Sequence, residues 1–208
     1  MSDVELSVRE DLPEIELIQS DDLKKKTYAA WVLALRNSSF SRISDMPGEA
    51  NPGQNVLKGY NQAAHLRGVT QLALRIADYF SGEFPEVRID RDTIIAGALC
   101  HDVGKAWECD PVNQKRWSED GSAAGWPSLR HPIYGAHICL TVGLPEAIAH
   151  IAACHSPEGE NVKRSLECFI VHKADYAWWE ISAAAGLTRS ETFPAHIAAK
   201  ISARALRS

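Results

Sequence analysis

The sequence predicts an all-α protein, and three observations indicate this class. From residue 60 onward, apolar residues recur at intervals of three and four, the spacing of one face of an α-helix. Residues suited to helix starts, Asp90, Pro132 and Pro145, stand at the beginning of several of these segments. Runs with the alternating pattern of a half-buried strand are sparse. We therefore expect a helical bundle.

Residues 1–58 are expected to form an N-terminal arm, a helix and a covering loop. Residues 1–19 alternate only weakly, which predicts a short hairpin or an irregular, loosely held arm without deciding between them. Ser20 is a candidate helix cap, and it precedes apolar residues at helical spacing, namely Tyr28, Trp31, Val32 and Leu35. Residues 37–58 are rich in Ser, Asn, Pro and Gly, and a loop of this length in a compact domain usually covers a site.

Residues 59–185 are expected to form the core. The run at 93–100 is apolar on every side, so it predicts a buried helix at the centre of the fold, ended by Gly104. A long helix is expected over about 163–185. A short helix after Pro194 is expected to pack on the core within residues 186–208, which leaves a single domain overall.

Charge and composition indicate which classes of molecule the protein is expected to bind. The formal net charge is −5 and no long basic run occurs, which argues against a polynucleotide partner and leaves small, possibly phosphorylated molecules. The N-terminus lacks a signal-peptide pattern, and no apolar run approaches the roughly 18 residues that cross a bilayer, so no membrane partner is expected. Five cysteines without a close pair favour a reducing, cytoplasmic compartment. The oligomeric state is not indicated.

Histidines and aspartates interrupt the apolar faces of the predicted helices. His65 shares a face with Val69, His101 and Asp102 extend the apolar run at 93–100, and His131 begins a helix. Two more inward positions lie further along the chain, His155 and Asp175. Buried imidazoles and carboxylates are costly without a partner, and a divalent metal satisfies both types of ligand. A metal site in a helical bundle is therefore expected.

The order of these residues along the chain, His, His-Asp, His, His, Asp, resembles that of the HD superfamily of metal-dependent phosphohydrolases. The matching segments lie within residues 60–180 and are AAHLRGV, ALCHDVGK, HPIYGA, IAHIAACHS and VHKAD. The resemblance implies an HD-domain helical bundle with two divalent metal ions, which are Fe, Mn or another transition metal. It implies that one metal is bound by His65, His101, Asp102 and Asp175, that the other is bound by His131 and His155, and that Asp102 bridges the two.

Two cationic residues near these ligands are candidates for substrate contacts. Lys105 follows the His-Asp pair and is a candidate catalytic and substrate-binding residue, because its charge would stabilise a developing oxyanion. The alternative role for Lys105 is that of a cation at a helix C-terminus. Arg130 is a candidate substrate-binding residue that would grip a phosphate, with a solvated surface arginine as the alternative. Asp102 is expected to be catalytic through the metals that it holds.

Three functions fit these features. The first is hydrolysis of a phosphate ester or anhydride in a small molecule by metal-bound hydroxide. The second is a di-iron oxygenase of the myo-inositol oxygenase or organophosphonate-cleaving type, because the same ligands accept iron. The third is a non-catalytic signalling module, which the complete ligand set argues against. The sequence does not indicate the substrate or the metal.

Overall fold

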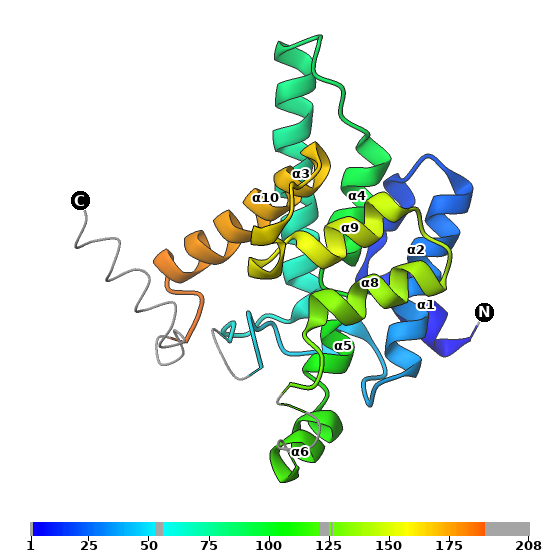
Figure 1. The fold of residues 1–208 in the computed structure, drawn as a ribbon, viewed down its shortest axis with the longest axis vertical. Coiled ribbons are helices and arrows are strands. Elements are labelled where there is room, and N and C mark those ends of the chain that lie inside the picture. The colour runs from blue at the N-terminus through cyan, green and yellow to red at the C-terminus, as the bar shows by residue number, and fades with distance from the viewer. Residues whose placement is uncertain (1, 53–55, 121–124, 126, 190–208) are drawn as a thin grey trace.

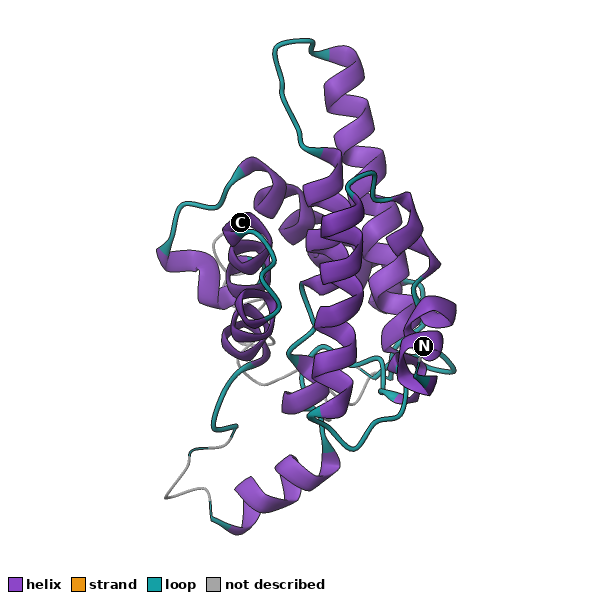
Figure 2. Cartoon of the chain, turned by 90° about the vertical axis from the view of Figure 1, so that its right-hand side faces the viewer, coloured by secondary structure: helices purple, strands orange, loops and turns teal. Residues whose placement is uncertain are grey.

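The computed structural model describes residues 2–52, 56–120, 125 and 127–189. Within this part of the chain the regular elements are helices (Figure 2), accompanied by two isolated β-bridges, Pro47 with Asn61 and Leu57 with Thr188. The predicted all-α class is confirmed. None of the described helices combines the length and the apolar character that a bilayer crossing requires.

The helices begin where the local sequence offers a cap. The side chains of Ser20, Asn61, Asp90 and Ser165 accept hydrogen bonds from the first turns of the helices that follow them. The α-helices are α1 (Asp3–Asp11), α2 (Asp21–Arg36), α3 (Gln62–Glu83), α4 (Arg91–Cys100), α5 (Lys105–Glu108), α6 (Pro111–Glu119), α8 (His131–Thr141), α9 (Glu146–Cys154) and α10 (Leu166–Ala184). Short 3-10 helices are η1 (Pro13–Leu17), η2 (Ile43–Asp45) and η3 (Pro157–Asn161).

Helix α4 lies at the centre of the molecule. Residues 94–100 are all buried, and the helix packs against α2, α3, α9 and α10 (Figure 1). The indole Nε1 of Trp31 on α2 donates a hydrogen bond of 2.8 Å to the carbonyl of Leu99. The predicted buried central helix is confirmed, because a helix that is apolar on every side is stable only when neighbours cover it all round. Its C-terminal end carries His101 and Asp102.

The end of α4 differs from the prediction. Gly104 has φ of −71° and precedes α5, so it does not end the helix as a left-handed cap. Glycine is needed there because a Cβ would lie 2.1 Å from the backbone oxygen of His131 and 2.7 Å from the backbone nitrogen of Gly135. Lys105 is the first residue of α5, a helix of only four residues, and it lies beyond the end of α4 at Cys100.

The N-terminal segment is neither a hairpin nor a loose arm. Ser2 and Glu5 form a capping box at the start of α1, and Pro13 opens η1. Four apolar side chains of this segment have no exposed surface, namely Val8, Leu12, Ile15 and Ile18. The prediction failed because the spacing of Val8, Leu12 and Ile15 is helical, but Pro13 divides it between two short elements.

Two peripheral regions project from the helical body. The C-terminal part of α3 extends from one end and α6 from the other (Figure 1).

The described part of the 37–58 loop contains η2, and Ala50 and Asn51 line a pocket. Residues 190–208 lie outside the described residues, so the short helix expected after Pro194 falls outside them as well.

Candidate metal centre

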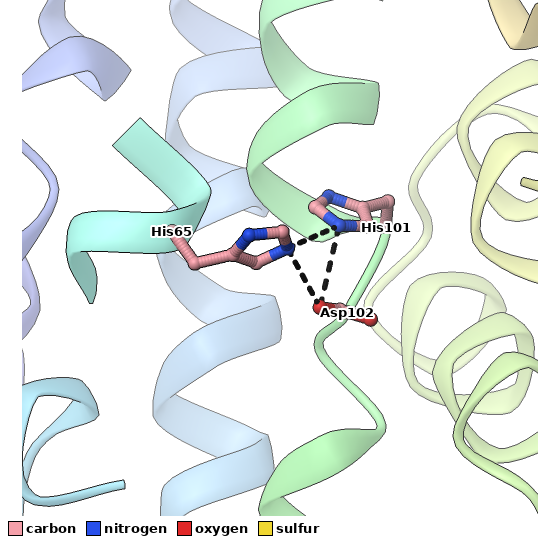
Figure 3. Close-up of side chains that lie close together, drawn as sticks. All are labelled: His65, His101 and Asp102. Atoms are coloured by element: carbon pink, nitrogen blue, oxygen red, sulfur yellow. Dashed lines mark hydrogen bonds and ion pairs between the residues drawn. The ribbon is translucent and has the colours of Figure 1, made fainter. Parts of the chain in front are cut away.

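The six predicted ligands converge from five parts of the chain. They come from α3, the turn after α4, the start of α8, the end of α9 and the middle of α10. Each is buried, from 0% exposure for His65 and His101 to 7% for Asp175. Figure 3 shows the ring of His65 on α3 pointing toward the ring of His101 and the carboxylate of Asp102.

One group of side chains gathers around Oδ2 of Asp102. This oxygen lies 3.2 Å from His65 Nε2 and 3.3 Å from His101 Nε2, and the two ring nitrogens are 3.2 Å apart. Oδ1 of Asp175 lies 3.3 Å from His65 Nε2 and 3.7 Å from His101 Nε2. Two imidazoles and two carboxylates therefore face a common point.

A second group gathers around the other oxygen of Asp102. Oδ1 lies 3.3 Å from His131 Nε2 and 3.5 Å from His155 Nε2. Each oxygen of this carboxylate thus faces a different pair of histidines. Such an arrangement suits a carboxylate that bridges two ions.

Hydrogen bonds outside the cluster orient two of the rings. Nδ1 of His101 donates to the carbonyl of Ala98 at 2.6 Å, and Nδ1 of His155 donates to the carbonyl of Ala152 at 3.0 Å. Because a carbonyl oxygen only accepts, the proton of each neutral ring is on Nδ1. The Nε2 lone pairs are left facing the cluster, as ligation requires.

The cluster is chemically suited to a divalent cation. Among the residues that the structure describes, Oδ1 of Asp175 has no hydrogen-bond partner, although it is buried. Burial opposes ionisation of Asp102, but the charge of Lys105 holds its pKa well below the usual range, so it is an anion. Converging lone pairs and carboxylates repel one another unless a cation lies among them. Imidazole and carboxylate donors together suit transition metals.

Comparison with known proteins agrees with this geometry. The family model described as HD domain matches residues 63–177. The chain belongs to the HD-domain family. The sequence resemblance to this family is thereby confirmed.

Two curated relatives share parts of this HD-domain protein. A dihydroneopterin 2′,3′-cyclic phosphate phosphodiesterase from Methanocaldococcus jannaschii is 35% identical over 116 residues, which cover 54% of this chain and 44% of the relative. A ribonuclease Y from Acidothermus cellulolyticus is 30% identical over 123 residues, which cover 59% of this chain and 19% of the relative. The HD-domain chain thus spans less than half the length of either relative. No solved structure matches it.

Lys105 lies directly beside the ligand cluster of the HD domain. It is 2% exposed, and its Nζ lies 2.9 Å from Asp102 Oδ2 and donates to the carbonyl of Glu49 at 2.6 Å. Nε2 of Gln62 donates to the same carboxylate oxygen at 2.9 Å. The sequence analysis missed Gln62, although it lies one helical turn before His65 on an inward face, which was a usable signal.

Arg130 and His131 share a buried carboxylate that the sequence analysis also missed. Glu108 has no exposed surface; it accepts a hydrogen bond from His131 Nδ1 at 2.5 Å and another from Arg130. Nε of Arg130 donates to Glu158 at 2.9 Å, so Arg130 is not a free surface arginine. No sequence signal marks Glu108, because its partners lie more than 20 residues away, at the start of α8.

A pocket of about 250 Å³ adjoins the cluster. Of the predicted site residues, Asp102, His131, His155 and Asp175 reach it, together with both cationic candidates. His65 and His101 are not among the lining residues. The other lining residues are Ala50, Asn51, Ser156, Tyr176, Trp179, Glu180, Ala183 and Thr188.

Proposed function

We propose that this HD-domain protein is a metal-dependent phosphohydrolase that cleaves a phosphodiester bond in a small molecule. The observation that carries the proposal is the carboxylate of Asp102, whose two oxygens face separate histidine pairs. The names of both curated relatives, a phosphodiesterase and a ribonuclease, concern phosphodiester bonds. The net charge of −5 and a pocket of about 250 Å³ favour a small molecule over RNA.

We assign the six ligands to two sites that share Asp102. The first site is formed by His65, His101, Asp102 and Asp175, and the second by Asp102, His131 and His155. Divalent ions bound there would lower the pKa of a coordinated water and neutralise charge that develops on phosphoryl oxygens.

The surrounding residues have supporting roles in this proposal. Lys105 and Gln62 each donate to Oδ2 of Asp102 and keep the carboxylate in one orientation. Lys105 also lines the pocket, where its ammonium group stabilises an anionic oxygen of the substrate. Arg130 contributes less to substrate binding, because two of its nitrogens already donate to Glu108 and Glu158.

Metal analysis tests the shared carboxylate. Protein stripped of metal and reloaded with Mn(II) or Fe(II) is expected to hold about two ions per chain. Replacing the proposed bridge (Asp102→Ala) should remove both ions, whereas Asp78→Ala, at an exposed aspartate of α3, should retain them. Full metal content in the Asp102→Ala protein would contradict the assignment.

The same proteins are then assayed under nitrogen and in air. Cyclic phosphodiesters, a short RNA, an organophosphonate and myo-inositol serve as substrates. We expect oxygen-independent hydrolysis of a cyclic phosphodiester, lost in Asp102→Ala and kept in Asp78→Ala. Activity confined to the iron form in air would favour the oxygenase alternative instead. Faster cleavage of RNA than of every cyclic phosphodiester would contradict a small-molecule substrate.

A further inference from the structure

The pocket beside the ligand cluster has an aromatic wall on α10. Asp175, Trp179 and Ala183 are spaced four residues apart, so they lie along one face of this helix. With a rise of about 1.5 Å per residue, Trp179 lies one turn beyond the metal ligand Asp175 and Ala183 one turn further. The ring of Tyr176 also lines the pocket. Along about 12 Å of this helix, the pocket wall thus passes from the proposed metal ligand Asp175 to the apolar side chain of Ala183.

The indole of Trp179 packs against three neighbouring side chains. Its ring centroid lies 4.8 Å from that of His65 and 5.1 Å from that of Trp178, and Nζ of Lys105 lies 5.7 Å from the ring. The side chain is nevertheless only partly buried, and it lines the pocket. A fixed, partly exposed indole is suited to stacking against a planar ring.

The charges of the pocket are largely neutralised by the protein itself. The cations of the described lining are Lys105, which pairs with Asp102, and Arg130, which pairs with Glu108 and Glu158. Glu180 adds a negative charge on an exposed part of the lining. Within the described lining, neither Lys105 nor Arg130 is left unpaired to hold a second or third phosphate.

From these features we infer that the pocket selects a molecule with a single phosphoryl group carried on a planar ring system. The phosphoryl group lies at the ligand cluster and the ring lies against Trp179. This inference rests on the proposed function, because the metal centre is what would hold the phosphoryl group. Trp179 is then the residue that determines specificity for the ring system of the substrate.

The test compares cyclic phosphodiesters with and without a ring system in Mn(II)-loaded protein. The measured quantity is the ratio of kcat/KM for adenosine 2′,3′-cyclic phosphate to that for glycerol 1,2-cyclic phosphate. Replacing the indole (Trp179→Ala) should lower this ratio about tenfold, the usual effect of losing one stacking contact. Trp179→Phe should retain most of the ratio, and Tyr79→Ala, at an exposed ring of α3, should retain all of it.

Competition tests the number of phosphoryl groups. With Mn(II) in excess of nucleotide, AMP should inhibit turnover of the cyclic substrate more strongly than ATP. Stronger inhibition by ATP, or an unchanged substrate ratio in Trp179→Ala, would overturn the inference.

If no phosphate ester is turned over, the proposed function fails and the pocket is tested by binding alone. Calorimetry then compares AMP with ribose 5-phosphate in the metal-loaded protein. A preference for AMP that is lost in Trp179→Ala supports the ring subsite, whereas equal binding of the two compounds rejects it.

Discussion

At the scale of single residues, the chemistry of Glu108 and His131 is set by their contact with each other. Burial alone would raise the pKa of Glu108, but the hydrogen bond from His131 and the charge of Arg130 lower it. Burial lowers the pKa of His131 although Glu108 opposes this shift. The pair therefore consists of an ionised carboxylate and a neutral imidazole, and the Nε2 lone pair of His131 faces Asp102. A metal-binding histidine needs this protonation state.

Removing the carboxylate should weaken one metal site more than the other. We expect Glu108→Ala to lower the affinity of the His131 site about 10- to 100-fold, because the ring loses its orientation and its tautomer is no longer fixed. The site of His65 and His101 should change less. Stepwise chelator titration of the Mn(II)-loaded protein measures both affinities.

Two further variants control this prediction. Glu108→Gln keeps an acceptor oxygen for His131 Nδ1 and should show a smaller loss than Glu108→Ala. Glu119→Ala removes an exposed carboxylate of α6 and should match the unmodified protein. Equal weakening of both metal sites in the Glu108 variants would mean that Glu108 only supports the fold.

At the scale of elements, the contact between α8 and the turn after α4 decides where His131 lies. The atom nearest to a Cβ added at Gly104 would be the backbone oxygen of His131, the first residue of a helix that begins 27 residues later. A Cβ added at Gly135, one turn into α8, would lie 3.3 Å from the backbone nitrogen of Gly104. Two glycines thus let these backbones approach closely enough to bring His131 to Asp102.

A methyl group at this contact should separate the two elements. We expect Gly104→Ala to destabilise the protein by about 1–3 kcal/mol, because backbone atoms cannot move aside as a flexible side chain can. It should also weaken metal binding at the His131 site. The matched variant is Gly82→Ala on α3, where the new Cβ would meet no other described atom within 4 Å apart from its chain neighbours and its own helix backbone. This variant should stabilise the protein by up to about 1 kcal/mol. Urea unfolding of the metal-free proteins gives both values, and similar midpoints for the two variants would refute the close contact.

At the scale of the whole molecule, the N-terminal helices support the centre of the fold. Helix α2 and η1 both pack against α4, and α1 packs against both of them. Because α4 leads directly into His101 and Asp102, this packing helps to position these two proposed ligands. Val8, Leu12, Ile15 and Ile18 therefore belong to the core that supports the proposed ligands.

A pair of leucines tests whether the N-terminal segment belongs to the core. Leu12 has no exposed surface, whereas Leu17 is 45% exposed. We expect Leu12→Ala to lower the free energy of unfolding by about 2–5 kcal/mol, the range for a buried leucine that leaves a cavity. Leu17→Ala should change it by about 0.5 kcal/mol or less. If thermal and urea unfolding show equal, small effects, the segment is a loosely held arm after all.

The sequence by itself determined the features that depend on neighbours within about two helical turns. The helical class, the buried helix at 93–100 and the caps at Ser20 and Asp90 all follow from local spacing and local hydrogen bonds. The six ligand positions were predicted in the same way, because each interrupts an apolar face or follows a family-like motif. Gln62 was within reach of the same reasoning, because it lies one turn from His65.

Only the tertiary structure decided the features that depend on contacts between distant segments. The pairing of Glu108 with His131, the close approach of Gly104 to α8 and the burial of Leu12 join residues on different elements. Helical periodicity shows which way a side chain faces, but it carries no information about which distant group will face it. The pairing of each Asp102 oxygen with its own pair of histidines is also a tertiary feature. The histidines come from the segments of α3, α4, α8 and α9, and these four helices must pack together before either oxygen faces its pair.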